Sequence, residues 1–259
     1  MKIATWNVNS VRSRLEHLEK YLGYAAPDVL CLQETKVEDA LFPREIFEKA
    51  GFRCLVLGQK SYNGVAILTK PEPSGILEGL SHLAPDHPLN AQKRLLSAVV
   101  GGVRVASLYM PNGEEVGSDK YSMKLAFMAE LRIWAEEVLK KGPLLILGDY
   151  NVAPAPEDLY NPEERGESIL CSAPEREGFG ALLNLGLADL FRRSHPEPGR
   201  YSWWDYRDGS YWKGHGMRLD HALGDAVVAA RLVDCDIDER PRKWMKPSDH
   251  TPLWVQLLD

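Results

Sequence analysis

Short apolar runs with the length and composition of β-strands recur along the whole chain, and their spread is the feature that most constrains the fold. Several runs do not alternate polar and apolar residues, which is typical of strands buried on both faces. Strands spread from end to end among a few helices predict one α/β domain, with packed sheets covered by helices. The expected strands are residues 2–6, 29–32, 54–57, 65–68, 95–100, 103–108, 144–147, 219–223 and 253–257.

Helical periodicity interrupts the strands in a few places. The apolar residues at positions 11, 15, 18 and 22 repeat at spacings of four, three and four, and a longer stripe runs from 125 to 138. A further helix is expected at 174–185. Segments 70–90 and 153–172 contain Pro and Gly and are expected to be long loops, which are often functional.

Composition indicates a single domain over residues 1–259. Hydrophobic residues make up 44% of the chain and charged residues 26%, close to the average for globular proteins, and no linker-like segment interrupts the pattern. The four cysteines are far apart and form no CxxC pair, which argues against a zinc site or a disulfide framework and favours a reducing compartment. Because no signal peptide and no membrane-length apolar run is present, we expect a soluble, cytoplasmic protein.

The net charge of −6 at first argues against a nucleic-acid partner, since phosphate binding usually requires an excess of Lys and Arg. However, a site for a divalent cation must itself carry several carboxylates. Local basic clusters remain, and a solvated charged face would explain them equally well. These clusters are Lys213, His215 and Arg218, and Arg240, Arg242, Lys243 and Lys246.

Acidic and amide side chains follow or precede several expected strands, where they can converge at the rim of a sheet. Hard cations such as Mg²⁺ prefer carboxylate and amide oxygens, whereas zinc prefers Cys and His. Each residue alone has a plainer explanation: Asn7 could cap a helix, and Asp149 could close a turn after Gly148. Together they predict a magnesium site formed by Asn7, Glu34, Asp149, Asn151 and Asp249.

Six ordered segments resemble the motif series of the exonuclease III family, within the endonuclease/exonuclease/phosphatase superfamily. The resemblance covers nearly the whole chain and implies a four-layered α/β sandwich with two packed mixed sheets flanked by helices. The segments are Trp6-Asn7-Val8-Asn9, Leu32-Gln33-Glu34-Thr35-Lys36, Tyr62-Asn63-Gly64-Val65-Ala66, Gly148-Asp149-Tyr150-Asn151, Arg218-Leu219-Asp220-His221 and Ser248-Asp249-His250-Thr251-Pro252.

The segment around Tyr109 resembles the corresponding segment of the abasic endonuclease branch, in which a tyrosine is followed by proline. The segment is Leu108-Tyr109-Met110-Pro111-Asn112-Gly113. Superfamily members resembling DNase I, sphingomyelinase or inositol phosphatases usually carry histidine in this region. An aromatic residue at a strand end would otherwise more often be core packing.

The resemblance also implies a role for each site residue. Glu34 resembles the principal metal ligand of the family, and Asn7 and Asp249 would lie near the same ion. Asp149 would prepare the attacking water, and Asn151 would orient it. His250, paired with Asp220, would contact the scissile phosphate, and it could be an imidazolium that donates a hydrogen bond there instead of acting as a base. Because neighbouring carboxylates titrate together, the identity of the base stays open at this point. Tyr109 and Asn112 would lie against phosphate oxygens or near the departing 3′ oxygen.

An aromatic segment resembles the family's pocket for an extruded abasic sugar. Trp203 would line this pocket with Met217 and Leu219, and Arg218 is counted among the substrate contacts. An abasic nucleotide costs less to extrude than an intact one, so selectivity would follow. The same tryptophans could instead fill core volume, and we expect one of Trp203 and Trp204 to be buried.

Three functions fit these residues. The first is a DNA repair nuclease that cuts duplex DNA 5′ to an abasic site and processes blocked 3′ ends, with Mg²⁺ or Mn²⁺ as the cofactor; a dedicated 3′-5′ exonuclease is a variant of it. The others are a phosphoesterase acting on a small molecule and a DNA-binding module without catalysis. Ser10 in place of a common glycine, Asn112 in place of glutamine, and the weakly patterned segment 158–172 depart from the family. The chain is expected to act as a monomer without an obligate protein partner.

Overall fold

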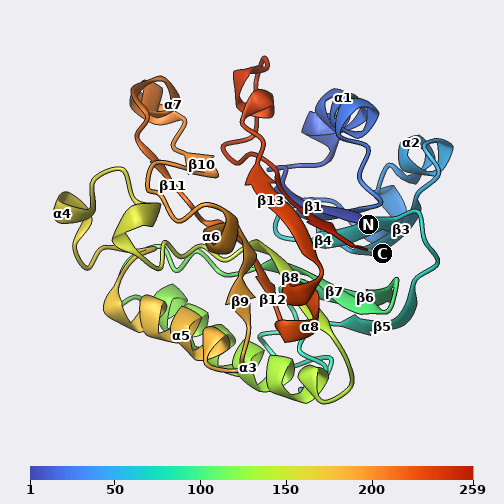
Figure 1. The fold of residues 1–259 in the computed structure, drawn as a ribbon, viewed down its shortest axis with the longest axis horizontal. Coiled ribbons are helices and arrows are strands. Elements are labelled where there is room, and N and C mark those ends of the chain that lie inside the picture. Colours follow the sequence, from blue (N-terminus) through green and yellow to red (C-terminus); the bar gives the residue numbers. More distant parts are fainter. Residues whose placement is uncertain (259) are drawn as a thin grey trace.

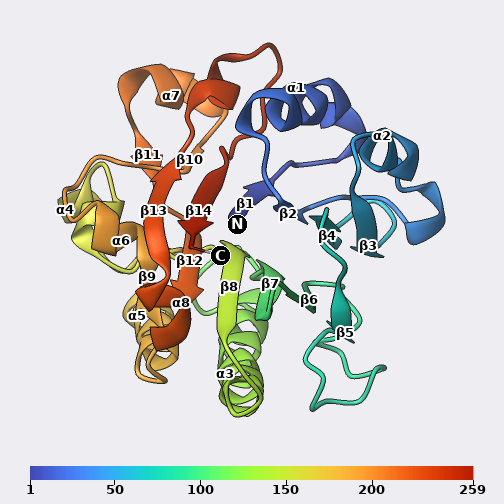
Figure 2. The same cartoon turned by 45° about the vertical axis from the view of Figure 1, so that its right-hand side comes forward.

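The computed structural model describes residues 1–258 and contains two six-stranded sheets packed face to face, with helices on both outer faces. Helices α1 and α2 cover one sheet, and α3 and α5 cover the other (Figures 1 and 2). This arrangement confirms the predicted four-layered sandwich. Within residues 1–258, no helix combines the length and the apolar character that crossing a membrane requires.

The first sheet has the strand order β13-β14-β1-β2-β4-β3. Its only parallel pair is β1 with β2, and the other described neighbours run antiparallel. The strands are β1 (Lys2–Asn7), β2 (Val29–Gln33), β3 (Arg53–Leu57), β4 (Val65–Thr69), β13 (Leu232–Ile237) and β14 (Leu253–Leu257).

The second sheet has the order β5-β6-β7-β8-β12-β9, and β7 and β8 are its parallel pair. A separate two-stranded ribbon pairs β10 (Trp203–Trp204) with β11 (Gly216–Met217). The strands of the second sheet are β5 (Ser74–Glu78), β6 (Leu95–Val100), β7 (Val103–Tyr109), β8 (Leu144–Asp149), β9 (Ala188–Asp189) and β12 (Asp220–Gly224).

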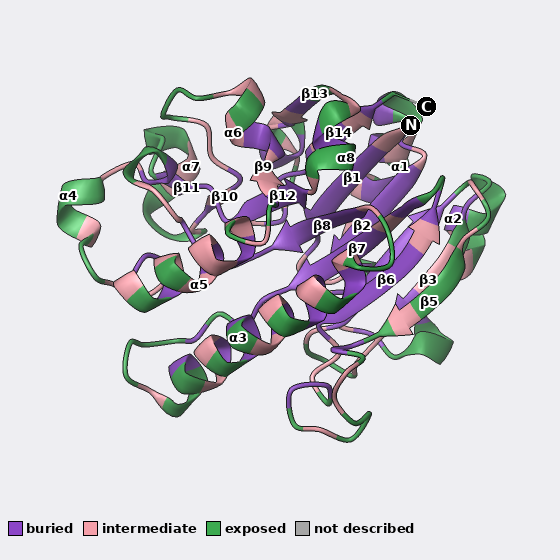
Figure 3. Cartoon of the chain, turned by 60° about the horizontal axis from the view of Figure 1, so that its bottom comes forward, coloured by how far each residue is buried: buried purple, intermediate pink, exposed green. Residues whose placement is uncertain are grey.

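Three hydrophobic layers hold the sandwich together. Between the sheets, Ile3 and Ile67 of the first sheet pack with Val105 and Leu147 of the second. Outside them, α1 and α2 bury residues such as Tyr21 against β1 and β2, and α3 and α5 pack on β7 and β8. Figure 3 shows α3 exposed along its outer face and β6, β7 and β8 almost entirely buried.

The helices are mostly short apart from α1, α3 and α5. The α-helices are α1 (Leu15–Ala25), α2 (Arg44–Lys49), α3 (Asp119–Leu139), α4 (Pro162–Arg165), α5 (Ala173–Leu183), α6 (Leu190–Ser194), α7 (Ser210–Lys213) and α8 (Ala226–Ala230). The 3₁₀ turns are η1 (Arg12–Arg14), η2 (Asp39–Leu41), η3 (Pro156–Asp158), η4 (Arg207–Gly209) and η5 (Arg240–Lys243).

The nine expected strands and three expected helices are present, with ends shifted by a few residues in the helices. The prediction that 70–90 is only a loop is wrong, because β5 lies within it. Strand β5 is an edge strand whose residues are largely exposed, so it lacks the apolar run that marks a buried strand. Segment 153–172 contains only η3 and the single turn of α4.

Candidate active site

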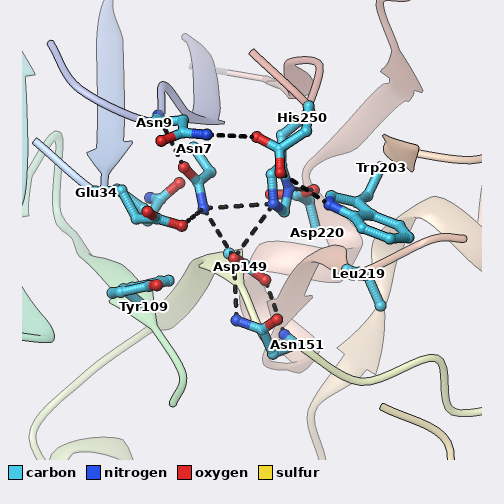
Figure 4. Close-up of polar contacts among 12 residues, drawn as sticks. Asn7, Asn9, Glu34, Tyr109, Asp149, Asn151, Trp203, Leu219, Asp220 and His250 are labelled. Carbon is cyan, nitrogen blue, oxygen red and sulfur yellow. Dashed lines mark hydrogen bonds and ion pairs between the residues drawn. The ribbon is translucent and has the colours of Figure 1, made fainter. Parts of the chain in front are cut away.

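Polar side chains from both sheets meet at one end of the sandwich, where β1, β2 and β8 finish and β14 begins (Figure 4). Asn7 ends β1, Glu34 follows β2, and Asp149 ends β8. Asp220 opens β12 directly opposite Asp149 in the antiparallel register. The sheet topology thus brings together residues that are far apart in the sequence.

Several non-glycine residues around this cluster have left-handed backbone conformations. Asn9 (φ 44°), Ser10 (φ 89°), Glu34 (φ 52°), Lys36 (φ 52°) and Asn151 (φ 49°) all show positive φ. Such conformations cost free energy and persist where the surrounding structure enforces them, as at functional sites. The value at Ser10 explains why glycine would also suit that position.

Asn7 lies at the centre of the cluster and is fully buried. Its Nδ2 donates to Glu34 Oε1 at 2.8 Å and to Asp149 Oδ2 at 2.9 Å, while its Oδ1 accepts from the backbone N–H of Asn9 at 3.0 Å. The amide nitrogen therefore faces the carboxylates and the oxygen is already engaged. In this orientation Asn7 positions two carboxylates instead of offering an oxygen to a cation.

Asp149 is almost completely buried and is held by Asn151. The backbone N–H of Asn151 donates to Asp149 Oδ1 at 2.8 Å, and Asn151 Nδ2 donates to Asp149 Oδ2 at 3.1 Å. Burial raises the pKa of Asp149 to about 7, and the nearby Asp220 and Glu34 carboxylates add to this increase while His250 opposes it. Asp149 is thus able to gain or lose a proton near neutral pH.

Gly148 is required for this placement of Asp149. Its φ is +147°, and a Cβ at this position would lie 1.9 Å from the backbone oxygen of Leu108 on β7. A side chain would therefore push β8 away from β7 just before Asp149.

His250 and Asp220 form a buried pair beside Asp149. His250 Nδ1 lies 2.7 Å from Asp220 Oδ2, and His250 Nε2 lies 3.6 Å from Asp149 Oδ2. Although burial lowers it, the carboxylates of Asp220 and Asp149 raise the pKa of His250 to about 10. The imidazole is therefore protonated at neutral pH and can donate from Nε2 into the site.

Asp249 is held at the other side of the cluster. Asn9 Nδ2 donates to its Oδ1 at 3.0 Å and Trp203 Nε1 donates to its Oδ2 at 3.1 Å. Burial would raise the pKa of Asp249, but His250 and these two hydrogen bonds lower it. Asp249 consequently stays a carboxylate.

Asn9, Lys36 and Arg94 belong to the site but were not predicted as functional residues. Lys36 Nζ contacts Glu34 Oε2 at 2.8 Å and donates to Asn9 Oδ1 at 2.5 Å. The guanidinium of Arg94 lies 4.6 Å above the ring of Tyr109. Asn9 and Lys36 stand inside the quoted motifs, which was a usable signal, whereas Arg94 stands in none of them.

Tyr109 ends β7 beside this cluster, as expected. Burial raises its pKa, with the neighbouring Glu34 carboxylate adding to the effect, so the hydroxyl is a donor at neutral pH. Asn112 lies close by, and its Nδ2 donates to Asn151 Oδ1 at 3.1 Å.

The expected pocket residues form an apolar cluster next to the site. Met217 and Leu219 are buried together with Ala153, Leu170 and Cys171. The partly buried ring of Trp203 packs on this cluster. The neighbouring Trp204 is buried, as expected for one of the two tryptophans. In Figure 4, Trp203 and Leu219 lie on the His250 side of the cluster.

The expectation that Arg218 contacts the substrate is contradicted by its position. Its side chain is buried and forms ion pairs with Asp158 at 2.6 Å and with Asp189 at 2.8 Å. The alternating direction of side chains along this segment turns Arg218 away from Met217 and Leu219. Of the other basic candidates, Arg242 is buried, and Arg240 is exposed but pairs with Asp238. Lys213, Lys243 and Lys246 are also exposed.

The donor set fits a hard divalent cation. Glu34 and Asp149 converge on the same amide nitrogen of Asn7, so two carboxylates lie close together. Asp149, Asp220 and His250 also form a compact group of potential ligand atoms, and Asp220 Oδ1 is buried without a hydrogen-bond partner. Because protonated His250 has no free lone pair, the oxygens of Glu34 and Asp149 are the better ligands.

Comparison with known proteins gives consistent matches over the whole chain. The profile of the Endonuclease/Exonuclease/phosphatase family matches residues 4–250. Exodeoxyribonuclease III of Haemophilus influenzae is 37% identical, with 99% of both chains covered. A 3′ phosphatase from Neisseria, solved with a product DNA hairpin, has a TM-score of 0.96 and 40% identity, covering 100% of both chains. An AP endonuclease from Archaeoglobus fulgidus has a TM-score of 0.93 and 36% identity, with 99% of both chains covered.

Proposed function

The chain belongs to the endonuclease/exonuclease/phosphatase family, in its exonuclease III branch of DNA repair nucleases, and from this we propose that it hydrolyses duplex DNA on the 5′ side of abasic sites. The cut would leave a 3′ hydroxyl. The same site would remove blocking groups and nucleotides from 3′ ends, in line with the phosphatase among its structural relatives.

The observation that carries this proposal is the position of two groups side by side: the Asp149 carboxylate, which can accept a proton, and the His250 imidazolium, which can donate one. Asp149, held in place by Asn151 and facing His250 Nε2 at 3.6 Å, is suited to accept the proton of the attacking water. His250, kept protonated by Asp220, is suited to donate from Nε2 to a phosphoryl oxygen. Proton acceptance and charge stabilisation are what in-line hydrolysis of a phosphodiester needs from its enzyme.

We assign the metal to the oxygens of Glu34 and Asp149, with Asp249 nearby, and propose Mg²⁺, with Mn²⁺ able to replace it. When bound, the cation would neutralise charge on the phosphate and on the departing 3′ oxygen. Asn7 keeps the two carboxylates together, and Lys36 limits the movement of Glu34 through its 2.8 Å contact. Tyr109 and Asn112 would approach the phosphate from the opposite side.

The apolar cluster of Trp203, Met217 and Leu219 would receive the abasic sugar. A base-free nucleotide leaves the duplex at lower cost than an intact one, and apolar walls would exclude a base by size.

A dedicated 3′-5′ exonuclease is the second candidate. Met217 and Leu219 are buried by their own neighbours, so a sugar could enter only if side chains move. The similar Neisseria protein, which is a 3′ phosphatase, is consistent with action at strand ends.

The decisive experiment uses a duplex with one tetrahydrofuran abasic analogue, incubated with Mg²⁺ or with EDTA, for the wild type and Asp149→Asn. We expect incision 5′ to the analogue that requires both Mg²⁺ and Asp149. Shortening from the 3′ end without internal incision would establish the exonuclease. Absence of any DNA cleavage would contradict both and favour a small-molecule phosphoesterase.

We further propose that the protein acts as a monomer in the cytoplasm without an obligate protein partner. All four cysteines are free thiols in the structure, and three of them are buried, which suits a reducing compartment. The exposed Lys213, Lys243 and Lys246 would then supply cations for the DNA backbone despite the net negative charge.

A further inference from the structure

A lysine with no exposed side-chain surface lies beneath the active site, and the mechanism above does not use it. Lys124 is on α3, and its Nζ donates to the backbone oxygen of Asn151 at 2.6 Å and to that of Asn112 at 3.1 Å. Its third partner is Glu175 on α5, which is equally buried. The ammonium thus has all three of its donors paired.

Two of these partners are backbone atoms of residues that border the reacting groups. Asn151 binds the Asp149 carboxylate, and Asn112 binds Asn151 through their side chains. Asn151 has a left-handed backbone at φ 49°, a conformation that needs external support in a residue other than glycine. The bond from Lys124 to the Asn151 carbonyl supplies such support.

The carboxylate of Glu175 extends the connection to the apolar cluster. Its Oε1 accepts from the backbone N–H of Leu170 at 3.1 Å, and its Oε2 accepts from the N–H and Oγ of Ser172 at 3.0 and 2.7 Å. Leu170 and the adjacent Cys171 pack in the apolar cluster with Trp203. One buried ion pair therefore contacts three segments that surround the site.

Gly113 shows how tightly the first segment fits over Lys124. Its φ is +93°, and a Cβ there would lie 3.1 Å from Lys124 Cδ and 2.9 Å from Ile169 Cδ1. The loop that carries Asn112 is thus packed directly on the lysine stem as well as bonded to its ammonium.

We propose that Lys124 is a positioning residue for the hydrolysis: with Glu175 it fixes Asn112, Asn151 and the pocket segment 170–172 relative to one another. The proposal rests on the proposed function, because it assumes that Asp149 and Asn151 act on the substrate. An apolar residue could fill the same volume, but it could not bond three acceptors from three segments. A buried ion pair is not in general a strong source of stability, which makes a positional role the better explanation.

The test compares Lys124→Met with Leu131→Ala in steady-state kinetics and thermal unfolding. Methionine keeps the length of the lysine stem without its charge. Leu131 lies on the same helix and is fully buried, and its apolar side chain makes no polar contact with the site, so its truncation destabilises α3 through lost packing. We expect kcat of Lys124→Met to fall by at least about tenfold with KM little changed, because small displacements of reacting groups are costly. Leu131→Ala should lower the melting temperature to a similar extent and keep kcat within about twofold.

A kcat for Lys124→Met no lower than that of Leu131→Ala, or a loss confined to KM, would overturn the proposal. If Lys124→Met does not fold, the double variant Lys124→Met/Glu175→Gln is measured in its place. This double variant contains no unpaired buried carboxylate. Kinetics are recorded both for incision at a tetrahydrofuran site and for shortening of an intact 3′ end. If the wild type shortens ends without incising, the abasic assignment fails, yet kcat for shortening still tests Lys124.

Discussion

His250 Nδ1 and Asp220 Oδ2 lie 2.7 Å apart in a pair that is almost completely shielded from solvent. The hydrogen bond orients the imidazole so that its Nε2 faces Asp149 at 3.6 Å. The negative charge of Asp220 also raises the pKa of His250 to about 10, against the effect of burial. Asp220 thus controls both the direction and the charge of the group that we place on the phosphate.

The first prediction concerns Asp220→Asn, which keeps the shape of the side chain but removes its charge. His250 should lose its proton more easily, and kcat should fall by about 10² to 10³, as for removal of a charge-stabilising donor. Steady-state kinetics across pH 5–9 would measure this, and the loss relative to wild type should be smallest at low pH, where His250 is protonated in both proteins. A kcat equal to wild type at neutral pH would remove Asp220 from the mechanism.

The second prediction concerns stability and pH in the presence of EDTA. The folded-state pKa of His250, about 10, exceeds its ordinary value of 6.5, so its contribution to stability is fully present below pH 6.5 and is lost as pH rises towards 10. The raised pKa of Asp149 acts in the same direction at lower pH, between 3.8 and about 7. Denaturant unfolding of wild type at pH 7, 8 and 9 should show falling stability, and His250→Asn should show a flatter profile. Parallel profiles for the two proteins would contradict the assigned protonation.

Buried strands could be predicted from the sequence because their apolar runs reflect contacts on both faces. Of the strands that were not predicted, β9, β10 and β11 have only two residues each. The other two, β5 and β13, are edge strands that bury little, and β13 contains the charged residues Asp234 and Asp236. Most expected site residues meet at one sheet end, since the rule that strand ends converge depends only on topology. The hydrogen-bond and ion-pair partners of these residues were harder to predict, because they depend on the direction in which each side chain points.

Arg218 and Asn7 illustrate this difference. Arg218 stands between two pocket residues in the sequence, yet it points to Asp158 and Asp189 in the interior. Asn7 lies where a ligand was expected, yet its amide nitrogen faces the carboxylates. Spacing identified the positions of both residues, but only three-dimensional packing revealed which atoms face the site.

The third prediction concerns Glu34→Ala. If Glu34 holds the cation, this variant should need at least about tenfold more Mg²⁺ for half-maximal activity and should have a lower maximal rate, since few ligands are available to replace it. Glu38→Ala, an exposed glutamate in the same segment, is the matched control and should titrate like wild type. The measurement is incision rate against Mg²⁺ concentration, with circular dichroism to verify folding. An unchanged midpoint for Glu34→Ala would exclude Glu34 as a direct ligand.

The fourth prediction separates two roles of Trp203, whose ring packs on the apolar cluster while its Nε1 donates to Asp249 at 3.1 Å. Trp203→Phe keeps an aromatic wall but loses the hydrogen bond, and Trp203→Ala loses both. If the ring forms the pocket, Trp203→Phe should keep the preference for a tetrahydrofuran site over an intact nucleotide. Trp203→Ala should lower this preference by about tenfold, which is the size of effect expected from one wall of an apolar pocket.

If the hydrogen bond to Asp249 matters for the metal, both variants should need more Mg²⁺. Competition between the two duplexes at fixed Mg²⁺, followed by a Mg²⁺ titration, distinguishes these effects. Unchanged preference in Trp203→Ala would mean that Trp203 serves Asp249 alone and that selectivity for abasic sites arises elsewhere.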